Sequence, residues 1–332
     1  MKRGSIMKKV RWGVLGTSNI ANNHTVPAMQ KAENASLYAV AGRSPEKTEA
    51  FLQKFGFEKA CLNYEELLED DQVEAVYISL PNSLHKEWVL KAAARGKHIL
   101  CEKPLSGNPQ DTKEMIEACY KAGVCFMEAF AYLHTPIIKS IKEALDAGCI
   151  GKPEYMETTY LIPTPAADNI RVNKETLGGA SYDVGCYNTS LVLALLGEMP
   201  YSVGAVSEFT AQGIDLLTSA VLKFPDGKRA GMTMGFCSPQ EVSRYFIHGS
   251  KGTLEAPVPF NSSGRLSYMI HTESGTDTYK FDVPDNYKLE IEQFGRCILE
   301  GEDPLVSHAF SMKVARVTEQ ILEAAGYGTL FA

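Results

Sequence analysis

Long runs of apolar residues are missing from this chain of 332 residues. A helix that crosses a bilayer needs about 20 apolar residues in succession, and the longest candidate, residues 190–196, is far shorter. The basic residues 1–9 are not followed by the apolar core of a secretory signal. We therefore expect a cytoplasmic protein that does not bind membranes.

Positive charge is also scarce. The chain carries 33 Lys and Arg against 40 Asp and Glu, which gives a formal net charge of -7. Nucleic acids and acidic membrane surfaces are bound by extended basic patches. The composition therefore argues against a nucleic-acid partner, although a local basic pocket for one phosphate stays possible.

Cysteine pairs with the C-x-x-C spacing are absent, although the chain has eight cysteines. The seven histidines show no spacing typical of metal ligands. Without a secretory signal, free buried thiols are a better interpretation than disulfides. We expect no metal site.

Short apolar strands alternate with helical patterns in the first third of the chain. Such alternation predicts a doubly wound parallel sheet. Beyond it, longer strands with few helices between them indicate a mostly antiparallel sheet. The fold class is therefore α/β, with two domains at residues 7–127 and 128–332. The expected strands are 10–16, 37–41, 75–80, 98–101 and 124–127, then 155–161, 218–224, 230–236, 244–248 and 278–283; later helices are expected at 182–196, 287–299 and 310–324.

The turn after the first expected strand stands where a dinucleotide-binding fingerprint belongs. Gly16 permits a tight turn, and Ala21 permits close packing of the following helix, whose N-terminus suits a pyrophosphate. Ser18 replaces the usual second glycine. An ordinary strand–helix turn explains the pattern equally well. The candidate cofactor residues of this turn are Gly16, Thr17, Ser18, Asn19, Ile20 and Ala21.

No carboxylate follows the second expected strand, where enzymes that prefer NAD usually have one. Arg43 and Ser44 stand there instead and could bind the 2′-phosphate of NADP. The alternative is that Ser44 only caps a helix and Arg43 is a solvated surface residue. We favour NADP, with NAD as the alternative.

Two further motifs carry groups suited to proton transfer. Lys103 follows the fourth strand, whose carboxyl end borders the ligand crevice of such a sheet. Asp183 and Tyr187 lie four residues apart on an expected helix and so share a face. Positive charge favours a tyrosinate, which can act as a general base for an alcohol. Taken alone, Lys103 also fits a surface lysine before Pro104, and Asp183 and Tyr187 fit a capping and a core residue better than a catalytic pair.

Together, these residues resemble the glucose–fructose oxidoreductase / inositol dehydrogenase family, also called Gfo/Idh/MocA. The resemblance covers nearly the whole chain. The stretches that carry it are residues 16–21, 80–85, 96–105, 127–130, 178–187 and 249–254. It implies an N-terminal Rossmann domain, a C-terminal α/β domain and hydride transfer with NAD or NADP.

Many family members have histidine where this chain has Tyr187. Tyrosine there resembles the branch of dihydrodiol dehydrogenase and NADP-linked xylose dehydrogenase, which implies a sugar, polyol or cyclic diol substrate. In that branch the lysine and the tyrosine act as a pair, which implies catalytic roles for Lys103 and Tyr187, oriented by Asp183. Further residues expected beside the cofactor are Leu80, Pro81, Asn82, His85, Glu102, Lys103 and Pro104.

Other expectations are less specific. Phe130, His134, Arg171 and Tyr287 are candidate substrate contacts, although loop or helix-cap roles suit His85 and His134 at least as well. The open face of the second sheet and the resemblance predict a homodimer or homotetramer. Two other functions stay open: a cofactor-binding regulator without turnover, and an eliminase or epimerase that regenerates its cofactor.

Overall fold

The computed structural model describes residues 8–327, which form two compact units. The first contains residues 8–105, 110–134 and 285–308, and the second contains residues 106–109, 135–284 and 309–327. The first unit therefore includes α8 (Asn286–Glu300), which follows the second sheet in the sequence. The expected division at residues 127 and 128 stays a prediction about functional domains.

The first unit is built around a six-stranded parallel sheet with the order β3-β2-β1-β4-β5-β6. This order confirms the predicted doubly wound arrangement. The strands are β1 (Val10–Leu15), β2 (Ala35–Ala41), β3 (Lys59–Cys61), β4 (Ala75–Ile78), β5 (His98–Glu102) and β6 (Phe126–Ala129); the helices besides α8 are α1 (Val26–Lys31), α2 (Pro45–Phe55), α3 (Tyr64–Glu69), α4 (His85–Ala94) and α5 (Pro109–Ala122).

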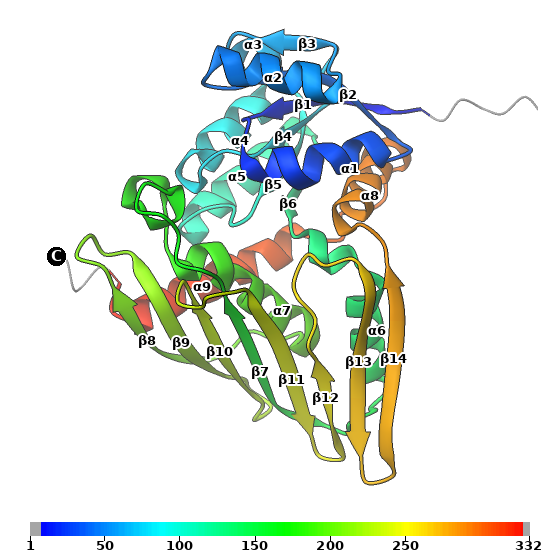
Figure 1. Cartoon of the computed structure of the whole chain (residues 1–332), viewed down its shortest axis with the longest axis vertical. Helices are drawn as coiled ribbons and strands as arrows, with labels where there is room; N and C mark the ends of the chain where they lie inside the picture. Colours follow the sequence, from blue (N-terminus) through cyan, green and yellow to red (C-terminus); the bar gives the residue numbers. More distant parts are fainter. Residues whose placement is uncertain (1–7, 328–332) are drawn as a thin grey trace, which may run out of the picture. The chain divides into compact units, whose positions relative to one another are not determined.

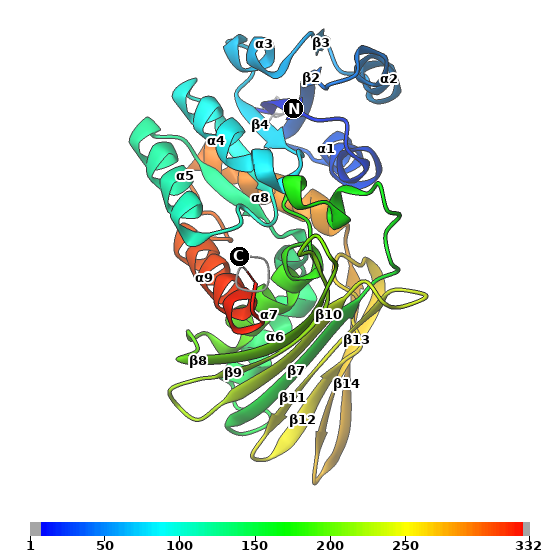
Figure 2. The ribbon, with the colours of Figure 1, turned by 90° about the vertical axis from the view of Figure 1, so that its left-hand side faces the viewer.

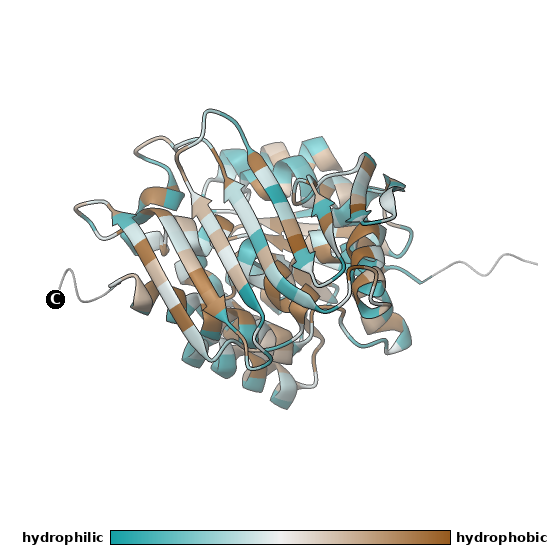
Figure 3. Ribbon diagram, turned by 90° about the horizontal axis from the view of Figure 1, so that it is seen from below, coloured by the Kyte–Doolittle hydropathy of each residue, from teal (hydrophilic) through white to brown (hydrophobic). Residues whose placement is uncertain are grey.

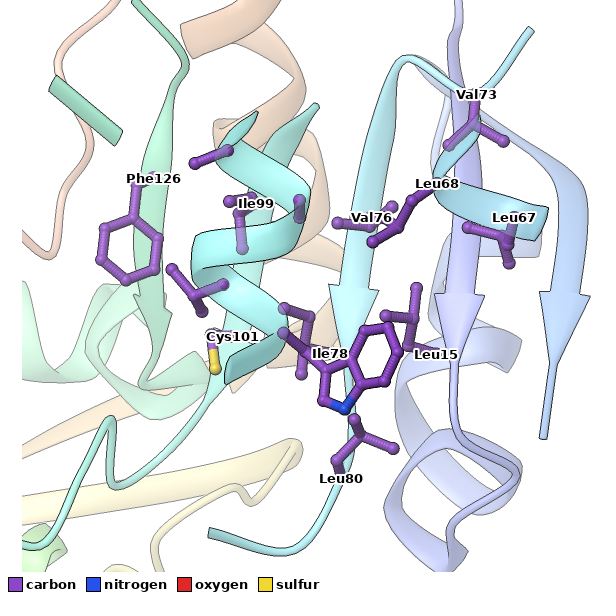
Figure 4. Close-up of a cluster of buried hydrophobic side chains, with 14 of the residues drawn as sticks. Leu15, Leu67, Leu68, Val73, Val76, Ile78, Leu80, Ile99, Cys101 and Phe126 are labelled. Carbon is purple, nitrogen blue, oxygen red and sulfur yellow. The ribbon is translucent and has the colours of Figure 1, made fainter. Parts of the chain in front are cut away.

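The strands of this sheet are continuous apolar runs because helices cover both of its faces. All four residues of β4 are buried. Leu15, Ile78 and Ile99 are fully buried in one apolar cluster, drawn in Figure 4. The strand order reverses direction between β1 and β4, so a ligand is expected beyond the carboxyl ends of these strands.

The second unit is built around an eight-stranded sheet with the order β14-β13-β12-β11-β7-β10-β9-β8 (Figure 1). Its pairs are antiparallel apart from β10 with β7, which is parallel. The predicted mostly antiparallel sheet is thus confirmed. The strands are β7 (Pro153–Leu161), β8 (Ser202–Phe209), β9 (Asp215–Lys223), β10 (Arg229–Gly235), β11 (Val242–Gly249), β12 (Gly252–Ala256), β13 (Gly264–Thr272) and β14 (Gly275–Val283).

One face of this sheet is covered by α6 (Pro136–Asp146), α7 (Cys186–Leu196) and α9 (His308–Ala324) (Figure 2). Nearly every residue of α7 is buried, so its apolar residues are not confined to one side of the helix. The opposite face carries no helix from residues 8–327, and Figure 3 shows its mixture of apolar and polar residues.

Membrane spans, metal sites and cysteines are considered over the same part of the chain. Between residues 8 and 327, no helix is long and apolar enough to span a bilayer, and no group of three or more His, Cys, Asp or Glu side chains is placed to hold a metal ion. All eight cysteines are free. The expectation that they are buried is wrong for Cys237, which is exposed on the segment after β10.

Candidate active site

Gly16 ends β1 in a conformation that favours glycine. Its φ is 103°, and a Cβ there would lie 3.0 Å from both Leu80 Cδ2 and Ser79 Oγ. The Ser79 hydroxyl donates to the carbonyl oxygens of Leu15 and Gly16 at 3.1 and 3.2 Å. The turn after β1 is therefore fixed against the end of β4, at the point where the strand order reverses.

The helix after this turn begins with a π-helical turn, η1 (Ala21–Thr25), which continues into α1. Ser18 Oγ accepts a hydrogen bond from the Ala21 N–H at 3.2 Å, so the serine in place of a glycine supports the start of the helix. A helix N-terminus beside a glycine turn suits an anionic pyrophosphate. The residues present therefore fit a dinucleotide cofactor.

The segment after β2 places Arg43 and Ser44 at the start of α2. Arg43 is exposed. Ser44 is the N-cap of α2: its Oγ accepts from the Lys47 N–H at 3.3 Å and donates to the Glu46 carboxylate at 2.7 Å. The helix-cap role is thus present, and it leaves the guanidinium of Arg43 exposed beside the cap.

His85 joins the two loops that follow β4 and β5. Its ring is buried, with Nδ1 2.9 Å from the Pro104 carbonyl oxygen and Nε2 2.9 Å from the Leu80 carbonyl oxygen. Burial lowers the pKa of His85. The imidazole therefore braces the segments expected to flank the nicotinamide ribose, Leu80, Pro81 and Asn82 on one side and Glu102, Lys103 and Pro104 on the other.

Glu102 and Lys103 lie at the carboxyl end of β5 and are both partly buried. The Glu102 carboxylate accepts a 2.5 Å hydrogen bond from Tyr77 Oη, which itself accepts from Thr25 Oγ1 at 3.0 Å. Burial and the nearby Glu102 raise the pKa of Tyr77 well above its usual value. This network fixes the residue directly before Lys103.

A buried acid and a buried imidazole lie near this network. His134 Nε2 is 4.0 Å from Glu290 Oε1, and neither atom has a hydrogen-bond partner within the described chain. Burial lowers the pKa of His134 to about 3, so its ring is neutral. Burial, with Glu102 nearby, raises the pKa of Glu290 well above its usual value.

The two other candidate substrate residues of this unit are aromatic and buried. Phe130 is fully buried, with its ring edge-to-face against Tyr132. Tyr287, on α8, is 7% exposed and stacks on His24 with 5.0 Å between ring centroids.

In the second unit, Asp183 and Tyr187 lie on the continuous helix formed by η6 (Ser181–Gly185) and α7. The buried Asp215 holds the beginning of this helix: its Oδ2 accepts from the Ser181 N–H at 2.7 Å and from Thr218 Oγ1 at 3.0 Å. Gly179, whose φ is 134°, leaves room for this carboxylate, because a Cβ there would overlap Asp215 Oδ1. Glycine is therefore needed just before the helix.

Arg171 forms an ion pair with Asp183 across the preceding loop. Its Nε donates to Asp183 Oδ2 at 2.5 Å. The Asp183 carboxylate raises the pKa of Arg171, with smaller contributions from the nearby Tyr187 and Tyr160. The arginine therefore brings positive charge to the Tyr187 phenol and partly neutralises Asp183.

Tyr187 is 8% exposed and lies in an aromatic cluster that the sequence did not reveal. Its ring is edge-to-face with Tyr160 at 5.5 Å and tilted against Phe260 at 5.2 Å. Asn261 Nδ2 donates a hydrogen bond to Tyr187 Oη at 2.9 Å. These residues come from β7 and from the segment between β12 and β13, and no local pattern links them to Tyr187.

The geometry thus groups the candidates by unit. The cofactor residues, Glu102 and Lys103 belong to the first unit, whereas Asp183, Tyr187 and Arg171 belong to the second. The pairing of Lys103 with Tyr187 stays a prediction.

Comparison with known proteins identifies the family. Residues 10–130 match the oxidoreductase family with an NAD-binding Rossmann fold, and residues 138–255 match the GFO/IDH/MocA C-terminal domain. The chain belongs to the Gfo/Idh/MocA family and is an NAD(P)-dependent oxidoreductase.

Its relatives span almost its entire length. The chain is 35% identical to D-xylose 1-dehydrogenase (NADP(+)) 2 of Haloferax volcanii, with 96% of this chain and 98% of the relative covered. It is 31% identical to trans-1,2-dihydrobenzene-1,2-diol dehydrogenase of Xenopus laevis, with 95% and 98% covered.

A 3-ketoreductase from Actinomadura kijaniata, solved with NADP and TDP-benzene, has a similar structure. The TM-score is 0.90 at 27% identity, with 96% of this chain and 98% of that chain covered. Structures of the same ketoreductase include a variant with phenylalanine in place of a tyrosine, and variants with alanine or glutamate in place of a lysine.

Proposed function

We propose that this protein transfers a hydride between NADP and the carbon of a hydroxyl or carbonyl group in a small sugar, polyol or cyclic diol. The observation that carries the proposal is the surroundings of Tyr187. Its phenol oxygen accepts from Asn261 and lies near the charge of Arg171. Both favour an anionic oxygen, which is what a general base for an alcohol requires.

The proposed role of each residue follows from the chemistry of its side chain. In oxidation, Tyr187 accepts the hydroxyl proton, and Lys103 donates a hydrogen bond to the reacting oxygen and favours the tyrosinate. NADP, when bound, would supply a nicotinamide as the acceptor for the hydride that leaves the same carbon. Asp183, held by Arg171, orients the tyrosine or a second substrate hydroxyl. Proton-transfer help of this kind contributes about 100-fold to 10,000-fold.

NADP is favoured over NAD by the segment after β2. It offers an exposed arginine and lacks the carboxylate that would repel a 2′-phosphate. The xylose dehydrogenase is named for NADP(+), and the ketoreductase was solved with NADP, which supports the same choice.

A substrate panel tests the proposal. D-Xylose, D-glucose, glycerol, inositol and trans-dihydrobenzenediol are each incubated with oxidised NADP and with NAD, and the reduced nicotinamide is followed by absorbance. Reduction of NADP by at least one sugar or diol is expected. If NADP binds but no substrate reduces it, chromatography of the mixtures decides between the alternatives. Substrate consumed without net reduction would indicate an epimerase or eliminase, and no consumption would indicate a regulator.

We further propose that the protein is cytoplasmic and that it assembles as a homodimer or homotetramer through the helix-free face of its second sheet.

A further inference from the structure

Asn261 has an unusual backbone conformation. Its φ is 45°, and Leu177 is the one other non-glycine residue between residues 8 and 327 with a positive φ. Asparagine tolerates this region better than most residues, but a side chain there still costs free energy. Such conformations persist where the surroundings hold them, and they concentrate at functional sites.

The residues directly before Asn261 are buried and held by packing contacts. Val258 and Phe260 are 5% and 4% exposed, and Ser243 Oγ donates to the Val258 carbonyl oxygen at 3.3 Å. The Phe260 ring packs on Tyr160 at 4.9 Å and on Tyr187 at 5.2 Å between centroids. The position of the Asn261 amide is therefore set by buried aromatic contacts.

The hydrogen bond from Asn261 has a defined direction. An amide Nδ2 only donates, so Tyr187 Oη must accept at 2.9 Å. The phenol proton is consequently directed away from Asn261. A hydrogen bond donated to a phenol oxygen becomes stronger when the phenol loses its proton, because the acceptor then carries a negative charge.

We propose that Asn261 is a positioning residue for proton transfer, which orients the Tyr187 hydroxyl and favours its ionised form. This inference rests on the proposed role of Tyr187. Arg171 supplies positive charge near Tyr187 but is paired with Asp183. Asn261 supplies a directional donor, at the expense of an unfavourable backbone conformation.

Two substitutions distinguish the effect of the Asn261 amide donor from the effect of its backbone conformation. Asn261→Gly removes the donor but suits a positive φ, so it should fold at least as well as the natural chain. Asn261→Asp keeps the shape and replaces the donor with a carboxylate. Ser263→Gly, at an exposed position of the same segment, is the matched control for added flexibility.

The first measurement is tyrosinate absorbance against pH on the full chain, with and without oxidised NADP. Each variant is compared with the same variant carrying Tyr187→Phe, so that the difference reports Tyr187 alone. Ionisation of Tyr187 should move to higher pH by about one unit or more in both Asn261 variants, as loss of a hydrogen bond to a charged group implies. An unchanged midpoint, or a shift equal to that of Ser263→Gly, would overturn the inference.

The second measurement is turnover with NADP and the best substrate of the panel. Asn261→Gly should lower kcat about 10-fold with little change in KM, the equivalent of one pH unit in the phenol. This loss should disappear in the Tyr187→Phe background. If the midpoint shifts while Tyr187→Phe turns over normally, the proposed function fails and the Asn261 contact stands. If Tyr187→Phe is inactive and the midpoint stays in place, only the role of Asn261 fails.

Discussion

Glu46 carries a carboxylate beside the expected site of the 2′-phosphate. Substituting this single residue tests whether the cofactor is NADP. Glu46 accepts from Ser44 Oγ at 2.7 Å, and this bond lowers the pKa of Glu46. A 2′-phosphate bound by Arg43 would meet this negative charge. Glu46→Gln should therefore tighten NADP binding several-fold and leave NAD binding unchanged, as measured by titration with each oxidised cofactor.

Two controls belong to this titration. Glu49→Gln removes an exposed carboxylate one turn further along α2 and should change neither affinity. Arg43→Ala should weaken NADP binding roughly 10-fold to 100-fold, the value of a charged hydrogen bond. Equal or tighter binding of NAD by the unaltered chain would show that Arg43 does not hold a phosphate.

The buried carboxyl group of Glu290 should make the stability of the fold depend on pH. Its pKa is raised well above 4.5 in the folded chain, so the folded state keeps a proton that the unfolded state releases above pH 4.5. The free energy of unfolding therefore falls as the pH rises from about 4.5 through the folded pKa. Glu290→Gln removes this dependence and should gain stability relative to the natural chain by about 1 kcal/mol per pH unit in that window.

Urea unfolding of both proteins at pH 7, 8 and 9 checks this expectation. His134, whose pKa is lowered to about 3, is present in both proteins, so its own titration cancels in the difference between them. A constant difference between the two proteins from pH 7 to pH 9 would mean that Glu290 is ionised when folded.

Among single residues, the sequence pointed to those candidates that form part of a local pattern. The glycine turn, Lys103 after a strand, and the spacing of Asp183 and Tyr187 were all visible. The roles of His85 and Asn261 were not. Each depends on a partner far along the chain, such as the Pro104 carbonyl oxygen or Tyr187 Oη, and no spacing rule predicts such contacts.

At the level of secondary structure, the helix that carries Asp183 and Tyr187 is held at its beginning by Asp215. Asp215→Ala removes acceptors for the Ser181 N–H and the Thr218 hydroxyl. The free energy of unfolding should fall by about 1–3 kcal/mol, the cost of buried donors left without acceptors. Urea unfolding measures this loss, and kcat should fall as well because the helix is less well held.

Asp277→Ala is the control for this substitution, because Asp277 is exposed on β14 and should be neutral. If Asp215→Ala has the same free energy of unfolding as Asp277→Ala, Asp215 does not anchor the helix.

The elements that the sequence predicted are those with a strong apolar pattern. The buried strands β1, β4 and β5 were placed to within two residues at each end. The missed elements include β8, where exposed and half-buried residues alternate and give little apolar signal. The missed strands β3, β12 and β13 and the missed helices α3 and α6 are likewise short, partly exposed or amphipathic. The π-helical turns at residues 21–25 and 181–185 lie within helical patterns and have no sequence signal of their own.

On the scale of the whole molecule, α8 shows why domain division is difficult to read from the sequence. It packs in the first unit, where Phe294 contacts Trp12 at 5.6 Å between ring centroids and the Asn34 amide donates to the Glu292 carbonyl oxygen at 2.8 Å. These contacts join residues more than 250 positions apart. A pattern that is read along the chain cannot reveal them.

The helix-free face of the second sheet predicts self-association. Val206 and Val221 share this face on the paired strands β8 and β9 and are 72% and 49% exposed. Exposed apolar residues on an open sheet face favour an interface. The natural chain should sediment as a dimer or tetramer, and Val206→Asp with Val221→Asp should shift it towards monomer.

Leu62→Asp is the control for this experiment, because Leu62 is 89% exposed in the first unit and should leave assembly unchanged. A natural chain that sediments only as monomer at working concentration would contradict the proposed assembly.

The proposed proton transfer in this NADP-linked oxidoreductase is carried out by Tyr187 and Lys103. Its most direct test is kcat for Tyr187→Phe and Lys103→Ala with the best substrate of the panel, alongside NADP affinity. Each substitution should lower kcat at least about 100-fold while NADP still binds. Near-normal turnover by Tyr187→Phe would contradict it.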